Sequence, residues 1–287
     1  MDDRSSFHKL WVIESLADGE LKTGRNLVDT QLAQAKLSHP DLIVSFESPH
    51  SKNQLLHVLN VIRDEAKNIG LCPMIHFECH GSPDGLTTAS GEFVEWEELR
   101  QSLIEINCAC RLNLVIVLAA CNGIHLIKVV TKLDRAPFWG VIGPETEVTA
   151  GAIERDFGAF YDEFFKSLDG IKALKALNLG TNSTSWTYHF RSAANLFTKA
   201  YVHYYKEHCV GSGLESRIEA LTDQVLQNPK VGNLDRTWAR AQVAERLKNG
   251  QQDFSRMKNQ FFFIDLFPEN RDRFPLSYQD VLAKTYP

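Results

Sequence analysis

The sequence predicts an α/β protein built on a mostly parallel six-stranded sheet with helices on both faces, followed by a helical C-terminal block. Two observations carry this prediction. In the first two-thirds of the chain, short apolar runs alternate with amphipathic segments of about 10–18 residues, as in a parallel sheet covered on both sides. Beyond residue 209 only helical periodicity remains. A length of 287 residues fits two unequal domains, which we place at 1–209 and 210–287.

The predicted strands are apolar runs that end in polar residues, proline or glycine. Pro49 closes the second run, and Gly81 breaks the third. The fourth run is the most apolar of the chain and ends in Ala-Cys-Asn-Gly. The six predicted strands span residues 8–16, 41–49, 73–81, 112–123, 138–144 and 186–192.

The segments between the strands have helical periodicity, with Gly70 as a C-cap of the second helix. Residues 82–96 are different, because a Pro-Asp-Gly turn and an alternating segment predict a small hairpin. We expect Gly211 and Gly213 to form a hinge or loop in the C-terminal block. The predicted helices span residues 24–37, 53–70, 97–109, 152–168, 169–180, 193–209, 214–227 and 234–267.

Composition excludes several classes of function. Thirty-one basic and 36 acidic residues give a net charge of −5, which argues against direct binding of nucleic acid. The N-terminus lacks the apolar segment of a signal peptide, and the longest apolar stretch, 114–121, is far shorter than the ~18 residues of a spanning helix. We therefore expect a cytoplasmic protein without a membrane contact, with six reduced cysteines and no cofactor.

Reactive residues follow two of the predicted strands. His80 and Gly81 end the third strand, and Cys121, Asn122 and Gly123 end the fourth. Sites in parallel sheets form outside the carboxyl ends of the strands, so neighbouring strands would bring this histidine and this thiol to one rim.

This pair of residue types suits acyl transfer. A free thiol is only a few per cent ionised at neutral pH, and a histidine within reach can accept its proton and then protonate a leaving amine. The backbone N–H groups of Gly81 and Cys121 are candidate donors to an oxyanion, and Gly123 permits a sharp turn after the thiol.

Simpler interpretations remain open. Cys121 can be a buried structural thiol, and His80 a strand-end histidine bonded to backbone. A metal site is disfavoured, although His76, Glu78 and His80 share one face of the strand, because no C-x-x-C partner is present. No G-x-G-x-x-G or G-x-x-x-x-G-K-[ST] motif supports nucleotide binding.

The stretch HFECHGSPDGL, followed by GEFVEWEEL and VIVLAACNG, resembles the caspase-like cysteine peptidases, and more narrowly their CHAT-type bacterial branch. In that family an apolar strand ends in His-Gly, a hairpin and a helix follow, and the next strand ends in a small residue, Cys and often Gly. The resemblance implies a caspase-like sheet, Cys121 as nucleophile and His80 as base. It also implies that the N–H groups of Gly81 and Cys121 form the oxyanion hole.

The chain departs from the better-known branches at Ala119, where caspases have Gln and metacaspases Asp. No third residue that orients His80 is evident. Charged residues on the rim are candidates for a substrate pocket, with turn formation or solvated loop charge as the alternative. Acids predominate among them, which favours a basic side chain at P1, the substrate residue before the scissile bond. The candidates are Asp84, Glu47, Arg25 and Glu145, with Glu14, Asp18 and Glu20 on the same rim.

The leading functional hypothesis is a cysteine endopeptidase that cleaves a specific protein substrate. The resemblance implies a role in bacterial defence, including antiviral defence, or in regulated cell death. It also suggests control by a partner protein or a proteolytic trigger, with the C-terminal helices as a docking surface. The alternative is an inactive caspase-like module that binds or scaffolds other proteins.

Overall fold

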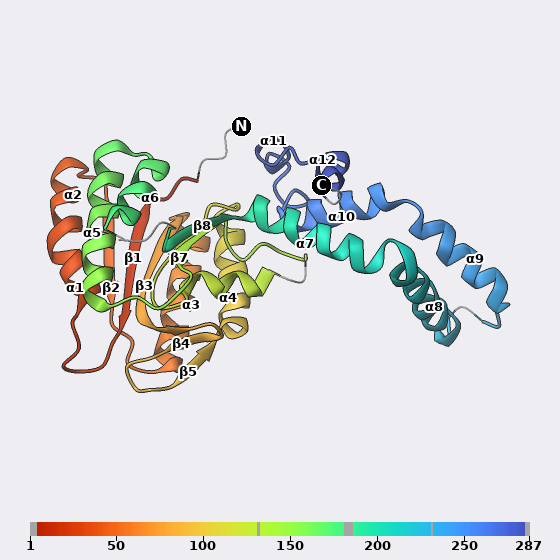
Figure 1. Ribbon diagram of the computed structural model, residues 1–287, viewed down its shortest axis with the longest axis horizontal. Helices are drawn as coiled ribbons and strands as arrows, with labels where there is room; N and C mark the ends of the chain where they lie inside the picture. The colour runs from red at the N-terminus through yellow and green to blue at the C-terminus, as the bar shows by residue number, and fades with distance from the viewer. Residues whose placement is uncertain (1–4, 131–132, 181–185, 231, 285–287) are drawn as a thin grey trace. The chain divides into compact units, whose positions relative to one another are not determined.

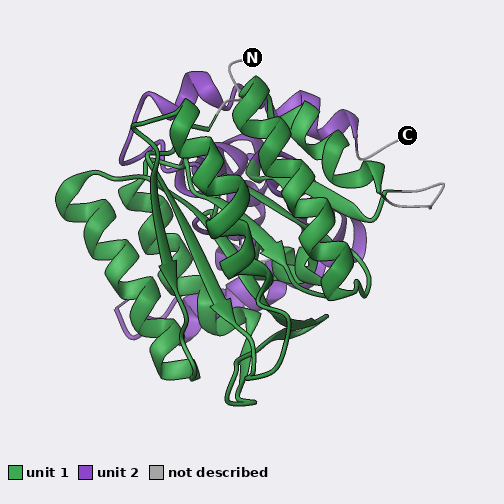
Figure 2. Ribbon diagram, turned by 90° about the vertical axis from the view of Figure 1, so that its left-hand side faces the viewer, with its two compact units in different colours: residues 1–132, 136–193 green, residues 133–135, 194–287 purple. Residues whose placement is uncertain are grey.

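The computed structural model describes residues 5–130, 133–180, 186–230 and 232–284 (Figure 1). Its contacts divide the chain into two compact units, which Figure 2 colours separately. Unit 1 comprises residues 1–132 and 136–193, and unit 2 comprises residues 133–135 and 194–287. Compact units need not coincide with domains, so the division after residue 209 stays a prediction.

Unit 1 contains all six predicted strands, in the order β2-β1-β3-β6-β7-β8. Neighbouring strands are parallel except β7 and β8, which are antiparallel. The predicted hairpin also forms and pairs with the end of β3. The α/β class and the mostly parallel sheet are therefore confirmed. The strands are β1 (Lys9–Ser15), β2 (Ile43–Glu47), β3 (Pro73–Ser82), β4 (Gly85–Thr87), β5 (Phe93–Glu95), β6 (Val115–Ala119), β7 (Gly140–Pro144) and β8 (Tyr188–Ser192).

Helices cover both faces of the sheet, as predicted (Figures 1 and 2). On one face, apolar strand residues such as Val12 and Val117 pack against Phe157 and Tyr161 of a helix that follows β7. This face is covered by α1 (Thr23–Leu27), the π-helical turn η1 (Val28–Leu32), α2 (Ala33–Ser38), α5 (Ala150–Ser167) and α6 (Gly170–Leu179). The other is covered by α3 (Lys52–Ile69) and α4 (Trp96–Ala109), and the 3₁₀ helix η2 (Gly123–Val130) contacts α4.

Local sequence explains where the longer helices begin and end. Ser51 and Gln54 form a capping box at the start of α3, which ends at Gly70 with a φ of 74°. Thr149 caps α5 by accepting a hydrogen bond from the N–H of Ala152. This cap fixes the point at which the chain leaves the rim of the sheet and enters the helix.

Unit 2 consists of helices, as the periodicity predicts. Its buried aromatic rings include Phe197, Tyr201 and Phe254, which contact one another. The loop expected at Gly211 and Gly213 is wrong, because Gly211 is already the first residue of a helix. The break after the preceding helix lies just before it, at residues 209–210. The elements are α7 (Ala193–His208), α8 (Gly211–Gln227), α9 (Arg236–Leu247), α10 (Gly250–Phe261), α11 (Asn270–Arg273) and α12 (Tyr278–Ala283).

Within the described ranges, none of the helices is both long enough and apolar enough to cross a lipid bilayer.

Candidate active site

The carboxyl ends of β1, β3 and β6 meet at one rim of the sheet. The last parallel pairs are Ser15 with Cys79 and Glu78 with Ala119. His80 is thus the first residue of β3 beyond the parallel sheet. The expectation that the strand stops at Gly81 is wrong, because β3 continues to Ser82 and pairs there with β4.

Gly81 packs directly against the chain that follows β6. A Cβ atom at this position would overlap the carbonyl oxygen of Cys121 and lie 3.0 Å from the Cβ of Ala120. Both obstacles belong to the short segment that carries the thiol. The absence of a side chain at Gly81 therefore allows the His80–Gly81 and Ala120–Cys121 segments to touch.

Cys121 lies two residues beyond the end of β6 and is partly buried. The turn after it is made by Asn122, whose φ is 57°, and not by Gly123 as the sequence suggested. Gly123 instead permits close packing, because a Cβ there would lie 2.6 Å from the Cβ of Leu118. Together the two residues direct the chain into η2.

The sulfur of Cys121 has a backbone partner from the loop before α5. The N–H of Val148 donates to Sγ at 3.4 Å, and the carbonyl of Val148 lies 3.4 Å from the same sulfur. These two contacts hold the sulfur beside the loop that precedes α5. No sequence pattern points to Val148, because the contact depends on how a loop 27 residues further along the chain folds back.

His80 has a carboxylate partner that the sequence did not identify as one. Its Nε2 lies 2.6 Å from Oε1 of Glu20, while Oε2 of Glu20 accepts a hydrogen bond from the N–H of Ala17 at 2.6 Å. The hydrogen bond with His80 holds the pKa of Glu20 below its usual value. No residue that orients His80 was evident from the sequence. In the structure Glu20, from the loop between β1 and α1, lies in that position.

The bond to Glu20 leaves the other ring nitrogen of His80, Nδ1, available to accept a proton. With Nε2 donating to Glu20, the lone pair of the neutral ring is on Nδ1. The imidazole is 61% exposed, and no hydrogen bond joins it to Cys121 among the residues that the structure describes. In the described part of the chain the two side chains thus share the rim without a direct hydrogen bond.

The other candidate pocket residues lie on separate loops with partners of their own. Asp84 pairs with Lys128 at 2.9 Å, and Glu145 pairs with His189 at 3.0 Å. The guanidinium of Arg25 lies 3.8 Å from the centre of the Phe46 ring. Glu47 is exposed at the end of β2. In the described part of the chain these four residues do not converge on one another, and their role in a pocket stays a prediction.

Beneath the rim lies a buried polar network. His76 is fully buried, with Nε2 2.8 Å from Glu78 and Nδ1 3.0 Å from the hydroxyl of Tyr161. Glu78 also accepts a hydrogen bond from the hydroxyl of Thr23 at 2.7 Å. No grouping of three or more His, Cys, Asp or Glu side chains in the described ranges is placed to hold a metal ion. His76 and Glu78 share a face, as expected, but they bond to each other.

Glu14 is the second buried carboxylate, paired in register with Glu78 on the neighbouring strand. Its Oε1 accepts hydrogen bonds from the N–H groups of Gly24 and Arg25 at 2.9 and 3.1 Å. Burial outweighs these bonds and raises the pKa of Glu14 above its ordinary value. The folded chain therefore holds this proton more tightly than the unfolded chain.

We expect the stability of Glu14→Gln relative to wild type to increase with pH. The contribution of a carboxyl with a raised pKa is complete below the unfolded pKa and is lost as pH rises through the folded pKa. The amide keeps an acceptor for Gly24 and Arg25 but does not ionise. Urea unfolding between about pH 4 and about pH 7 measures the difference in unfolding free energy. A difference that stays constant or falls would contradict the expected cause.

No family model matches the sequence, and none of the curated proteins compared with it matches either. Among solved structures, the chain is similar to the Drosophila initiator caspase Dronc, with a TM-score of 0.47 and 12% sequence identity. The similarity covers 66% of this chain and 81% of the Dronc chain. At this level it assigns neither a family nor an activity.

Proposed function

We propose that the chain is a cysteine endopeptidase in which Cys121 is the nucleophile and His80 the general base. The observation that carries the proposal is the packing of Gly81 against the carbonyl of Cys121, because it places a thiol, an imidazole and two backbone N–H groups at one rim. These are the groups that acyl transfer by a thiol requires.

The proposed reaction has two stages. Nδ1 of His80 takes the proton of Cys121 as Sγ attacks the carbonyl carbon of the scissile peptide bond. The C–N bond breaks, the leaving amine receives the proton from His80, and a thioester remains on Cys121. Water, deprotonated by His80, then attacks the thioester, which releases the carboxylic acid and restores the thiol. In both tetrahedral intermediates the oxyanion accepts hydrogen bonds from the N–H groups of Gly81 and Cys121.

His80 must turn toward Cys121 for this reaction, and its exposure leaves room for the movement. Catalytic hydrogen bonds are often long or unformed without substrate. Glu20 supports the productive state, because its bond to Nε2 selects the tautomer with a free Nδ1 and stabilises the imidazolium that forms. We assign Glu20 as a positioning residue.

Glu20→Ala is expected to lower kcat by about tenfold to a hundredfold with little change in KM, because it removes orientation and not substrate binding. Glu20→Gln should restore part of the rate, since its amide oxygen can still accept from Nε2. The test compares kcat and KM of both variants with those of Glu163→Gln, which loses a carboxylate on α5. Equal rates for wild type and Glu20→Ala would remove Glu20 from the mechanism.

The cellular role follows from the resemblance alone. We propose a cytoplasmic enzyme that cleaves one dedicated protein and acts in bacterial defence, including antiviral defence, or in regulated cell death. Control by a partner protein or a proteolytic trigger fits such a role, and the helices of the C-terminal block, residues 210–287, are the proposed docking surface. Neither nucleic acid nor a membrane is a proposed partner.

The second candidate is an inactive binding or scaffold module. The observation in its favour is the lack of a direct hydrogen bond between His80 and Cys121 in the described part of the chain. Fluorogenic peptides that vary at P1 distinguish the peptidase from the inactive module. Only the peptidase would cleave them, and its cleavage would depend on both Cys121 and His80.

A further inference from the structure

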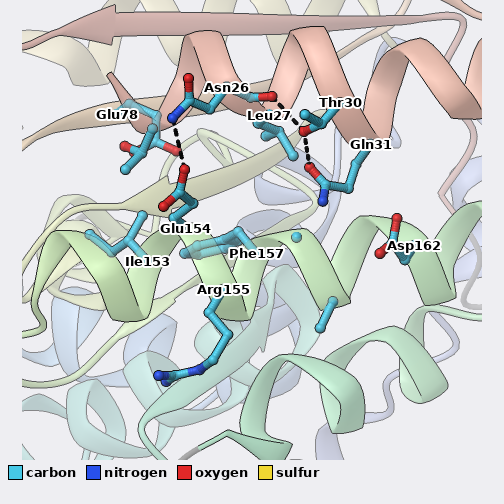
Figure 3. A pocket seen from close by; sticks show the side chains of 13 residues that line it. Asn26, Leu27, Thr30, Gln31, Glu78, Ile153, Glu154, Arg155, Phe157 and Asp162 are labelled. Atoms are coloured by element: carbon cyan, nitrogen blue, oxygen red, sulfur yellow. Dashed lines mark hydrogen bonds between the residues drawn. The ribbon is translucent and has the colours of Figure 1, made fainter. Parts of the chain in front are cut away.

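A pocket of about 530 Å³ lies between α1 and α5, on the face of the sheet that carries Glu78 (Figure 3). We call it the α1–α5 pocket. Its walls combine apolar side chains with carboxylates, and none of the candidate pocket residues singled out in the sequence lines it. The residues used below are Thr23, Asn26, Glu78, Ile153, Glu154 and Phe157.

Several residues that line the pocket lie close in sequence to the proposed catalytic residues. Glu78 precedes His80 by two positions on β3, so both side chains leave the same face about 6.6 Å apart along the strand. Thr23 follows Glu20, the partner of His80, by three residues. The opposite wall starts just after Val148, whose backbone contacts the sulfur of Cys121.

Carboxylates dominate the end of the pocket that is near the rim. Figure 3 shows Glu78 and Glu154 at the same end as Ile153, with Asp162 at the far end. Glu154 is exposed and its Oε1 accepts a hydrogen bond from the side chain of Asn26 at 2.7 Å, across the gap between α1 and α5. The Asn26 amide is neutral, so it does not balance the negative charge of Glu154.

The single basic lining residue does not cancel these charges. Arg155 points away from α1 in Figure 3, and its Nε pairs with Asp156 at 2.8 Å. Ile153 and Phe157 add apolar surface beside the carboxylates. A long side chain with an apolar stem and a cationic end is complementary to such a lining.

We propose that the α1–α5 pocket binds the lysine or arginine side chain of the P1 residue of the substrate. The inference rests on the proposed peptidase function and names its substrate class. The cationic group pairs with Glu154 in place of the Asn26 amide and faces Glu78, while the methylene groups pack on Ile153. An extended lysine or arginine spans the distance of two strand residues, about 6.6 Å, between the rim and Glu78.

The first experiment measures binding without catalysis. Benzamidine, an amidinium that resembles the end of an arginine, is titrated into full-length wild type, Glu154→Gln, Glu78→Gln and Glu163→Gln. Each variant replaces one carboxylate by an amide, and Glu163 lies on the same helix outside the pocket lining. We expect binding about tenfold weaker in the first two variants and unchanged in Glu163→Gln. Circular dichroism verifies that each variant is folded. Glu154→Gln is the variant least expected to disturb folding, because Glu154 is exposed.

The second experiment measures specificity by cleavage. Peptides with arginine or citrulline at P1 differ in charge and not in shape. Wild type should prefer arginine by about a hundredfold in kcat/KM, and Glu154→Gln should reduce that preference about tenfold while its rate on the citrulline peptide is retained. Cys121→Ala tests separately whether the cleavage belongs to the proposed site.

Together the two experiments distinguish a failure of the pocket assignment from a failure of the proposed peptidase function. If cleavage depends on Cys121 but shows no preference for arginine, or if the preference survives in Glu154→Gln, the pocket assignment is overturned and the peptidase function stands. If benzamidine binds all four proteins equally, the pocket assignment is likewise overturned. If benzamidine binding requires Glu154 but no peptide is cleaved, the pocket takes a cation and the peptidase function, with the P1 role, fails.

Discussion

Cys121→Ala is expected to reduce cleavage of fluorogenic peptides by at least about a thousandfold, to the background rate, because the variant lacks the sulfur that forms the proposed thioester. His80→Ala should lower the rate by about a hundredfold or more, since the thiol then loses its base. The measurement is kcat/KM on a peptide library that varies at P1, with both variants verified as folded.

Cys209→Ser is the matched control for this experiment. It also removes a thiol, but from unit 2, where burial raises the pKa of Cys209. Its rate should equal that of wild type. If Cys121→Ala retains the activity of wild type, the peptidase proposal is wrong and Cys121 is a structural thiol. A wild type that is silent on every peptide, alone and with partner proteins encoded nearby, would favour the scaffold alternative.

Gly81→Ala is expected to damage both activity and stability. The added Cβ would overlap the carbonyl oxygen of Cys121, a backbone atom that cannot rotate away as a side chain does. Relief requires the two segments to separate, which displaces one proposed oxyanion donor and should cost about a hundredfold in kcat. Overpacking of this kind costs about 1–3 kcal/mol in unfolding free energy.

Gly151→Ala provides the comparison, because a Cβ at that position meets nothing within 4 Å and the residue lies in α5. Kinetics and urea unfolding of the two variants should differ sharply, with the control at least as stable as wild type. A fully active Gly81→Ala would show that the rim is not built on this close approach.

The sequence predicts the framework of the site well, and the reason is physical. Short apolar runs rich in β-branched residues, such as the one before Cys121, are typical of buried strands, and their alternation with amphipathic helices favours parallel pairing. The neighbouring positions of β3 and β6 then bring His80 and Cys121 to one rim. Periodicity and the rule that sites form at the carboxyl ends of strands led to this rim, on the condition that the two strands are neighbours. The structure meets that condition.

The details that complete the site could not be obtained in that way. Glu20 and Val148 belong to loops, whose course is set by tertiary contacts and has no periodic signal. The turn at Asn122 was assigned to Gly123 because glycine is the usual residue in the left-handed region, although asparagine also adopts it. The α1–α5 pocket depends on residues of two helices that are distant in sequence.

The proposal depends most on Cys121 being an accessible nucleophile that His80 assists. The most direct test is covalent labelling by a peptidyl acyloxymethyl ketone, followed by mass spectrometry of the digested protein. Burial raises the pKa of Cys79 to about 12, and a hydrogen bond with Cys72, together with burial, raises the pKa of Cys110. These thiols should therefore stay unlabelled at neutral pH. We predict one label, on Cys121, slowed in His80→Ala and absent in Cys121→Ala. Equal labelling of wild type and His80→Ala, or a label on other cysteines alone, would contradict the account.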